Sequence, residues 1–400
     1  MPAGRRWQLP LLLVLVSALV VLLTLESCDF ARSRVAMRAR PVPAMAFPGE
    51  AWERVTPEEV RVDARSLGKA VAWFEDLAPG NAAENFVIVR YGRVIWEGPK
   101  AGEAWGTWSV TKAFTSTVFG LLVGDGLCDP GTRVAEILPE MESAYPEVTM
   151  GHLMAMVSGY EAVGDWPPLG TKNQIGGGLT PFDPSPEPQF APGRRFSYWD
   201  SGMNVFGLAL TKLGGESMRA LFQRRIGSPI GMASDAWDWG KFTEWDGIAV
   251  HGGSGNKGKH VVISARDLAR FGHLMLTRGR WKDRQLIDES WVDLATSIQV
   301  PEHLPLGGPI RHRYGKTFHM DGRGVYGFNW WVNGVQPDGK RLWPGVPEAT
   351  FGAIGFKNQR MFIIPEWHMV VVRLGRNERE RRIHRREFAG FLRRIGKAIH

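Results

Sequence analysis

An apolar run in the middle of the chain opens with Trp108-Ser109-Val110-Thr111-Lys112 and ends near Gly126. Between Ala113 and Val123 nearly every residue is apolar or carries a small hydroxyl, which predicts a helix buried on most of its sides. Lysine is rarely buried without a partner or a task, because removing an ammonium from water is costly. The run therefore predicts an amine, Lys112, inside an apolar helix.

Ser109 lies three residues before Lys112, so the two side chains share one helical face with Cβ atoms about 5–6 Å apart. A serine hydroxyl is a poor nucleophile until a base takes its proton, and a desolvated amine can be that base. A serine at a helix N-terminus also has backbone N–H groups nearby that can bind an oxyanion. The alternative interpretation is a serine that caps a helix and a lysine at the surface.

The composition is that of a globular protein with one or two domains, since 44% of its 400 residues are hydrophobic and 22% are charged. The formal net charge of +8 is concentrated in residues 376–400, which hold nine Lys or Arg and three Glu. Apolar residues recur there at helical spacing. The pattern favours a packed C-terminal helix with a solvated basic face over a nucleic-acid-binding element, and contact with an anionic membrane surface is a secondary alternative.

The N-terminus has the pattern of an export signal. Arg5 and Arg6 precede an uncharged run, Leu9–Leu25, which predicts a signal peptide or membrane anchor over residues 1–28 and an exported, periplasmic or extracytoplasmic, membrane-tethered protein. Cys28 follows Leu-Glu-Ser, which resembles the lipobox of bacterial lipoproteins. Lipidation of Cys28, an uncleaved anchor and simple secretion all stay open.

We expect a linker over residues 29–55 and a single catalytic domain over residues 56–400. If Cys28 is processed, only Cys128 remains and no internal disulfide can form.

The predicted elements indicate an α+β fold. A β-hairpin is expected at 86–96, and helices at 66–77, from Thr149 to Met156, from Ser201 to Gly215 and from Ser264 to Leu276. Late strands are expected at 326–332, 360–364 and 369–374. We therefore predict an antiparallel sheet built from 56–108 and 322–400, flanked by helices, with a mostly helical and loop region, 109–321, inserted between them. The Pro-rich and Gly-rich segment 160–193 is either a functional loop or a surface elaboration.

Several motifs, taken in order, resemble the serine β-lactamase-related superfamily, and within it the class C-like esterases and 6-aminohexanoate-dimer hydrolases. They are Trp-Ser109-Val-Thr-Lys112, His152 through Ser158-Gly159, Pro192-Gly193 with Phe196 and Tyr198, and Ser264-Ala-Arg-Asp267. The resemblance covers roughly residues 55–398 and implies the β-lactamase/transpeptidase-like fold.

Carried over to this chain, the resemblance implies that Ser109 is acylated, that Lys112 helps to activate it, and that Tyr198 passes a proton to the leaving group. Asp200 stands where many relatives have Asn, and it would either orient Tyr198 or cap the helix that begins at Ser201.

The strand motif that reads K-T-G or H-x-G in relatives is matched best by Ala353-Ile354-Gly355. Neither Ala353 nor Ile354 supplies a hydroxyl or a cation for a substrate carboxylate, which argues against strong penicillinase or D,D-peptidase activity. The backbone N–H of Phe356 would join that of Ser109 in the oxyanion hole, and Gly355 would allow the acyl group to approach closely.

Other chemistry has little support in the sequence. His251-Gly252-Gly253 either lines the site or is a turn with an incidental histidine. Neither H-E-x-x-H nor paired Cys/His spacing occurs, and no phosphate-binding loop is present, so we expect no metal and no cofactor.

We therefore predict a serine hydrolase that acts on a small-molecule ester or amide, contacts the membrane through its N-terminal segment and binds no nucleic acid. The alternatives are a D,D-carboxypeptidase or β-lactamase-type penicillin-binding enzyme, and a non-catalytic cell-envelope binding protein with the same fold. The oligomeric state stays open.

Overall fold

The computed structural model describes residues 41–160, 187–255, 258–307, 310–311, 317–318, 320–376 and 383–400. Cys28, the predicted signal or anchor segment 1–28 and most of the 160–193 segment lie outside these residues. Among the helices that can be described, none is both long enough and apolar enough to cross a membrane.

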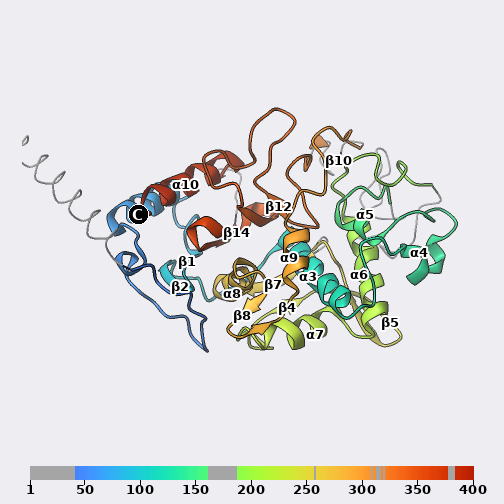
Figure 1. The fold of residues 1–400 in the computed structure, drawn as a ribbon, viewed down its shortest axis with the longest axis horizontal. Helices are drawn as coiled ribbons and strands as arrows, with labels where there is room; N and C mark the ends of the chain where they lie inside the picture. Colours follow the sequence, from blue (N-terminus) through green and yellow to red (C-terminus); the bar gives the residue numbers. More distant parts are fainter. Residues whose placement is uncertain are drawn as a thin grey trace, which may run out of the picture.

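A six-stranded antiparallel sheet joins the two ends of the described chain (Figure 1). The strand order is β12-β13-β14-β15-β1-β2, so the N-terminal hairpin pairs directly with the last strand of the C-terminal segment. This arrangement confirms the predicted α+β fold with a sheet built from both ends of the sequence. The strands are β1 (Asn85–Arg90), β2 (Arg93–Glu97), β12 (Trp331–Val332), β13 (Phe351–Gly355), β14 (Gln359–Ile364) and β15 (Met369–Leu374).

The predicted hairpin is confirmed, with Tyr91 and Gly92 as its two turn residues. Both have positive φ, 50° and 74°, as a type I′ turn requires. The predicted strand over 326–332 is wrong for most of its length, because only Trp331–Val332 is a strand. The chain turns just before it, where the Gly327 N–H donates to the Trp330 carbonyl and Asn329 has a φ of 66°.

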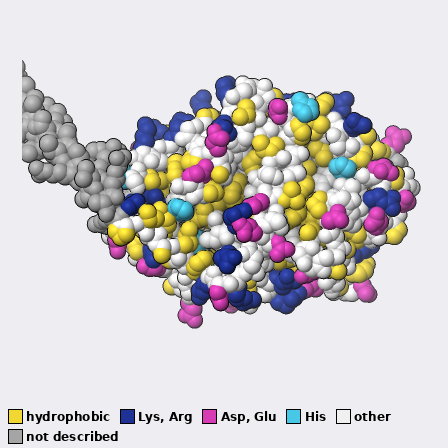
Figure 2. All heavy atoms as spheres, in the orientation of Figure 1, with side chains coloured by type: hydrophobic (Ala, Val, Ile, Leu, Met, Phe, Trp, Pro, Cys, Tyr) yellow, Lys and Arg dark blue, Asp and Glu magenta, His cyan; other side chains and the backbone are white. Residues whose placement is uncertain are grey.

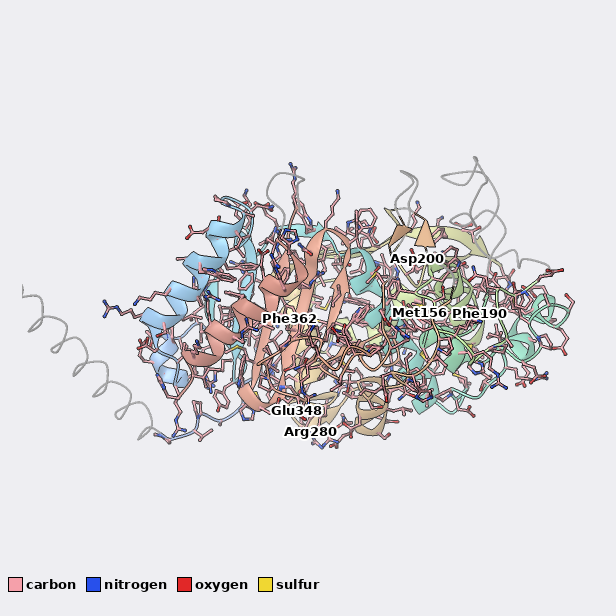
Figure 3. All side chains as sticks on the ribbon, turned by 90° about the horizontal axis from the view of Figure 1, so that it is seen from above. Met156, Phe190, Asp200, Arg280, Glu348 and Phe362 are labelled. Carbon is pink, nitrogen blue, oxygen red and sulfur yellow. The ribbon has the colours of Figure 1, made fainter. Side chains whose placement is uncertain are left out.

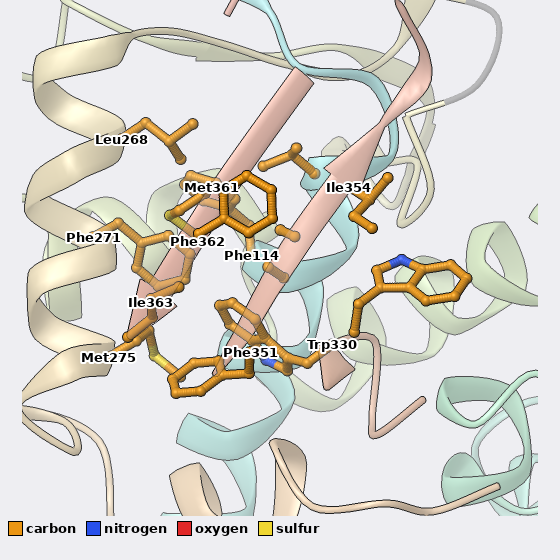
Figure 4. Packing of buried hydrophobic residues seen from close by; sticks show 14 of the residues in the cluster. Phe114, Leu268, Phe271, Met275, Trp330, Phe351, Ile354, Met361, Phe362 and Ile363 are labelled. Atoms are coloured by element: carbon orange, nitrogen blue, oxygen red, sulfur yellow. The ribbon is translucent and has the colours of Figure 1, made fainter. Parts of the chain in front are cut away.

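Helices cover both faces of the sheet. The amphipathic helices α2 (Ala64–Leu77) and α10 (Arg385–Lys397) pack together on one face, where the Phe74 and Phe391 rings stack 4.4 Å apart. α8 (Ala265–Leu276) covers the other face of the sheet (Figure 4). The helix and the sheet pack so closely that a Cβ added to Gly272 would lie 2.7 Å from a methyl carbon of Val370 on β15. α10 is the C-terminal helix that the sequence predicts. Figure 2 shows basic and acidic side chains interspersed over the visible face of the molecule.

The helix starts predicted from the sequence agree with the structure where the side chain of Ser or Thr caps the helix. The Ser264 hydroxyl accepts from the Asp267 N–H at the start of α8, and Thr149 caps α5 in the same way. α2 begins two residues before the expected position because Asp63 is its N-cap. α5 ends two residues before the expected Met156, which has a φ of 60°.

The inserted region holds the other helices together with short strands that the sequence did not predict, and one more short strand, Ala104–Gly106, precedes it and pairs with the strand Val261–Ser264. The helices are α3 (Thr111–Gly124), α4 (Val134–Ile137), α5 (Met150–Met154), α6 (Asp200–Gly214), α7 (Met218–Phe222) and α9 (Glu289–Ala295). The strands are β3 (Ala104–Gly106), β4 (Asp238–Trp239), β5 (Lys241–Trp245), β6 (Ile248–His251), β7 (Val261–Ser264), β8 (Arg280–Trp281), β9 (Arg284–Gln285), β10 (Ile310–Arg311) and β11 (Thr317–Phe318).

The described part of the expected 29–55 linker, residues 41–55, lies along the domain. The Ala46 N–H donates to the Tyr91 carbonyl, and the Trp52 indole, 8% exposed, donates to the Arg266 carbonyl. Arg54 forms an isolated parallel bridge with Val94. This segment is therefore anchored to the β1–β2 hairpin and to α8.

Candidate active site

Ser109 lies in a 3₁₀ turn, Trp108–Val110, directly before α3. The turn is fixed by β7, because the Thr107 hydroxyl donates to the Val261 carbonyl and the Val261 N–H donates to the Thr111 hydroxyl, at 2.8 and 2.9 Å. Trp108 has a φ of 53°, a left-handed backbone conformation that residues other than glycine rarely adopt. Ser109 itself is half-buried, so its hydroxyl sits at the edge of the core.

Lys112 is only 1% exposed, as the apolar run predicted. Its Nζ lies 3.3 Å from the Ser109 hydroxyl, 2.8 Å from the Asp200 carboxylate and 3.3 Å from the Ser254 carbonyl. Every residue of α3 from Thr111 to Leu122 is buried. The amine is therefore held against the serine in surroundings from which water is largely excluded.

Asp200 is the counter-ion of Lys112. It is the first residue of α6 and is labelled in Figure 3. Trp199 is the N-cap of that helix and forms no side-chain capping hydrogen bond. Its side chain is 26% exposed, whereas that of Lys112 is 2% exposed. A buried ammonium needs such a partner, because an unpaired buried ion costs several kcal/mol. The chain thus places a carboxylate at the position where many relatives have an amide.

Tyr198 lies next to the same amine. The Lys112 Nζ is 4.7 Å from the centre of the Tyr198 ring. The ring is 7% exposed, stacks on Trp331 at 5.9 Å and meets Tyr326 edge-on at 6.0 Å. Complete burial raises the pKa of the Tyr326 phenol and keeps that group neutral. The structure therefore brings Ser109, Lys112, Tyr198 and Asp200 together.

The end of β13 approaches the backbone that precedes Ser109. A Cβ on Gly355 would lie 2.2 Å from the Thr107 carbonyl oxygen, so only glycine fits at this position. The Phe356 ring meets the Trp108 ring edge-on at 5.2 Å. β12 pairs with β13 only at Phe351 and Gly352, which leaves the later part of that edge without a neighbouring strand among the described residues.

A cation beside the site was missed in the sequence. Lys357 follows Phe356 at the end of β13, is exposed, and places its Nζ 5.8 Å from the centre of the Trp108 ring. The other neighbour of Trp108 is His260, whose ring centre is 5.0 Å away and whose pKa is lowered by burial. Lys357 stands two residues after Gly355 in the sequence, just beyond the strand motif, so a cation near the motif could have been predicted.

His251 belongs to the core. It is 4% exposed, its ring lies 5.7 Å from that of Trp239, and burial lowers its pKa. No group of three or more His, Cys, Asp or Glu residues that could hold a metal occurs in the described part of the chain.

The family of the chain is shown by a family model that matches most of its sequence. The family model described as Beta-lactamase matches residues 79–389, which include Ser109, Lys112, Tyr198 and Phe356. The chain belongs to the Beta-lactamase family. Membership places it among the serine hydrolases, and it confirms the resemblance that the ordered motifs indicated.

Relatives within this family carry hydrolase names. The chain is 23% identical, over 333 residues, to a 6-aminohexanoate-dimer hydrolase of Paenarthrobacter ureafaciens, a match that covers 80% of this chain and 79% of that protein. Its fold is similar to that of a putative 6-aminohexanoate-dimer hydrolase from Bacillus anthracis, with a TM-score of 0.55, 19% identity and 78% of each chain covered. A family VIII carboxylesterase superposes with a TM-score of 0.59 and 16% identity over 84% of this chain and 97% of that one.

Proposed function

We propose that the protein hydrolyses a small-molecule ester or amide through an acyl-enzyme on Ser109. The observation that carries the proposal is the buried Lys112 amine 3.3 Å from the Ser109 hydroxyl. A purely structural role has no use for an amine buried against a hydroxyl, whereas an activated serine requires one. The names of the hydrolase relatives are consistent with this reaction class.

In the proposed reaction, Lys112 acts as the neutral amine and takes the Ser109 proton as the oxygen attacks the substrate carbonyl, and the Asp200 carboxylate, 2.8 Å away, stabilises the ammonium that forms. The tetrahedral oxyanion is bound by the backbone N–H groups of Ser109 and Phe356. Tyr198 returns a proton to the departing alcohol or amine, and the acyl group stays on Ser109. Water then attacks the acyl-enzyme ester and gives its proton to the Tyr198 phenolate, while the Lys112 ammonium returns its proton to the Ser109 oxygen as the acid product leaves.

One observation favours a second candidate, a penicillin-binding or β-lactamase-type enzyme. Such an enzyme needs a cation near the site for the substrate carboxylate, and Lys357 supplies an exposed one beside Trp108. The cation stands after Phe356 rather than at the position of Ala353, where relatives have the lysine of K-T-G. We therefore rank this activity second.

A two-substrate assay tests the proposal. The full chain and Ser109→Ala are compared on a nitrophenyl ester and on a chromogenic cephalosporin. We expect Ser109-dependent hydrolysis of the ester, with the cephalosporin at least about ten times slower in kcat/KM. Faster turnover of the cephalosporin would establish the second candidate. Equal, negligible rates for parent and Ser109→Ala on both substrates would favour a binding protein.

A further inference from the structure

The turn that carries Phe356 has an unfavourable backbone. Phe356–Asn358 joins β13 to β14, and both Lys357 and Asn358 have positive φ, 58° and 64°. Two consecutive left-handed residues that are not glycine persist only where their surroundings impose that conformation.

Two buried arginines impose it. Arg360, 4% exposed, donates from Nη1 to the Gly355 carbonyl at 2.9 Å and from Nη2 to the Asn358 side-chain oxygen at 2.8 Å. Arg373, 1% exposed, donates to the Lys357 and Asn358 carbonyls at 3.1 and 3.3 Å. Burial lowers the pKa of the Arg373 guanidinium to about 10, which shows how costly this placement is.

The contact between Arg360 and Gly355 fixes the direction of the next N–H group. In a planar trans peptide, the Gly355 carbonyl and the Phe356 N–H point in opposite directions. The carbonyl is bound on the β14 side, by the side chain of Arg360, the second residue of that strand. The Phe356 N–H must therefore point to the opposite edge of β13, the edge that β12 leaves open beyond Gly352.

The open edge faces the Ser109 turn. The Thr107 carbonyl oxygen lies 2.2 Å from the Cβ position of Gly355, and the Trp108 and Phe356 rings are in contact. If Arg360 released the Gly355 carbonyl, the peptide between Gly355 and Phe356 could rotate and turn its N–H away from the serine.

We propose that Arg360, supported by Arg373, is a positioning residue of the oxyanion hole, which holds the Gly355–Phe356 peptide so that its N–H faces the acyl carbonyl bound to Ser109. The inference rests on the proposed function. A merely structural arginine would affect folding alone, whereas a positioning residue affects the charge that develops on the carbonyl oxygen in the transition state.

The test compares an oxygen ester with its thiono analogue, in which sulfur replaces the carbonyl oxygen. Sulfur is larger and a weaker hydrogen-bond acceptor, so the ratio of the two kcat/KM values reports on the oxyanion hole. The variants are Arg360→Gln and Arg360→Lys. Arg270→Gln is the matched control, because Arg270 is also buried and donates to two carbonyls, those of Ile230 and Glu50, far along the chain from the site.

We expect Arg360→Gln to lower the oxygen-to-sulfur ratio about tenfold or more, up to the roughly 100- to 1,000-fold effect of losing one oxyanion donor completely. Arg360→Lys should give an intermediate ratio, and it decides the question if Arg360→Gln does not fold. Arg270→Gln should lower the thermal midpoint by a similar amount and leave the ratio within about twofold of the parent.

A parental ratio in both Arg360 variants, or an equal change in Arg270→Gln, would overturn the inference while the proposed function stands. A parent that shows no Ser109-dependent ester hydrolysis would overturn both.

Discussion

Helices α3 and α8 both bury basic side chains, but the two helices use them differently. They pack on each other through Phe114 and Phe271, whose ring centres are 4.6 Å apart. On α3, Lys112 contacts the Ser109 hydroxyl and the Asp200 carboxylate in addition to the Ser254 carbonyl. On α8, Arg270 donates to the carbonyls of Ile230 and Glu50, and the His273 Nε2 lies 2.8 Å from the Ala46 carbonyl.

The partners of these side chains indicate two roles, a chemical role for the basic group on α3 and an anchoring role for those on α8. A buried basic group bound to carbonyls holds a segment in place, and on α8 Arg270 and His273 fasten the chain before β1 through the carbonyls of Glu50 and Ala46. A cation beside a hydroxyl can exchange a proton with it. Changes on α3 should therefore reduce the rate more than the stability, and changes on α8 should do the reverse.

The largest expected effect is that of Lys112→Met, which removes the amine and keeps the length of the side chain. We expect ester kcat/KM to fall by about 100- to 10,000-fold, the usual range for loss of a proton-transfer group, with little change in the thermal midpoint. Lys212→Met on α6 is the control, since Lys212 lies 3.7 Å from Glu140 in an ordinary partly exposed pair. Retention of more than about a tenth of the activity by Lys112→Met would refute the proton-transfer role.

The next effect comes from Phe356→Pro, which deletes the backbone N–H. Phe356 is the first residue of a 3₁₀ turn, where proline is tolerated, and Gly355 before it is extended with a φ of −115° and a ψ of 160°, as the residue before a proline must be. We expect a loss of about 100- to 1,000-fold in kcat. Phe356→Ala keeps the N–H and should lose far less.

If Phe356→Pro and Phe356→Ala have equal rates while both fold, the N–H of Phe356 takes no part in the reaction.

The smallest expected effect is a loss of folding stability at acid pH, caused by the anchoring residue His273 on α8. Burial lowers the pKa of His273 to about 4, so the folded state keeps it neutral while the unfolded chain takes up a proton below about pH 6.5. Stability is therefore lost as the pH falls from 6.5 towards 4, by about 1.4 kcal/mol per pH unit. Urea unfolding at pH 7 and pH 5 should show about 2 kcal/mol more loss for the parent than for His273→Gln. Identical losses would show that His273 is protonated without cost in the folded state.

Several features around the candidate site were predictable from sequence because they follow local rules. The apolar run around Lys112, the Tyr91-Gly92 turn and the Ser264 cap depend on neighbours within a few residues, and the structure confirms the buried lysine, the hairpin and the helix start. The family resemblance added Tyr198, which no local pattern singles out.

The contacts that hold the site were not predictable, because they act over long separations or through the backbone. The resemblance singled out Asp200, but not its pairing with Lys112, 88 residues away, and the Ser254 carbonyl is 142 residues from Lys112. Arg360 and Arg373 bind carbonyl oxygens, which every residue carries, so their role leaves no trace in the sequence. The same limit explains the incorrect strand at 326–332, where a tight turn interrupts an apolar pattern.

The most direct test of the account is intact mass spectrometry of the full chain after exposure to a fluorophosphonate, beside Ser109→Ala and Lys112→Met. We predict one adduct on the parent, none on Ser109→Ala, and an adduct that forms far more slowly on Lys112→Met. A folded parent that stays unmodified, or a Ser109→Ala variant that is labelled as fast as the parent, would contradict the claim that Ser109 is a nucleophile activated by a buried lysine.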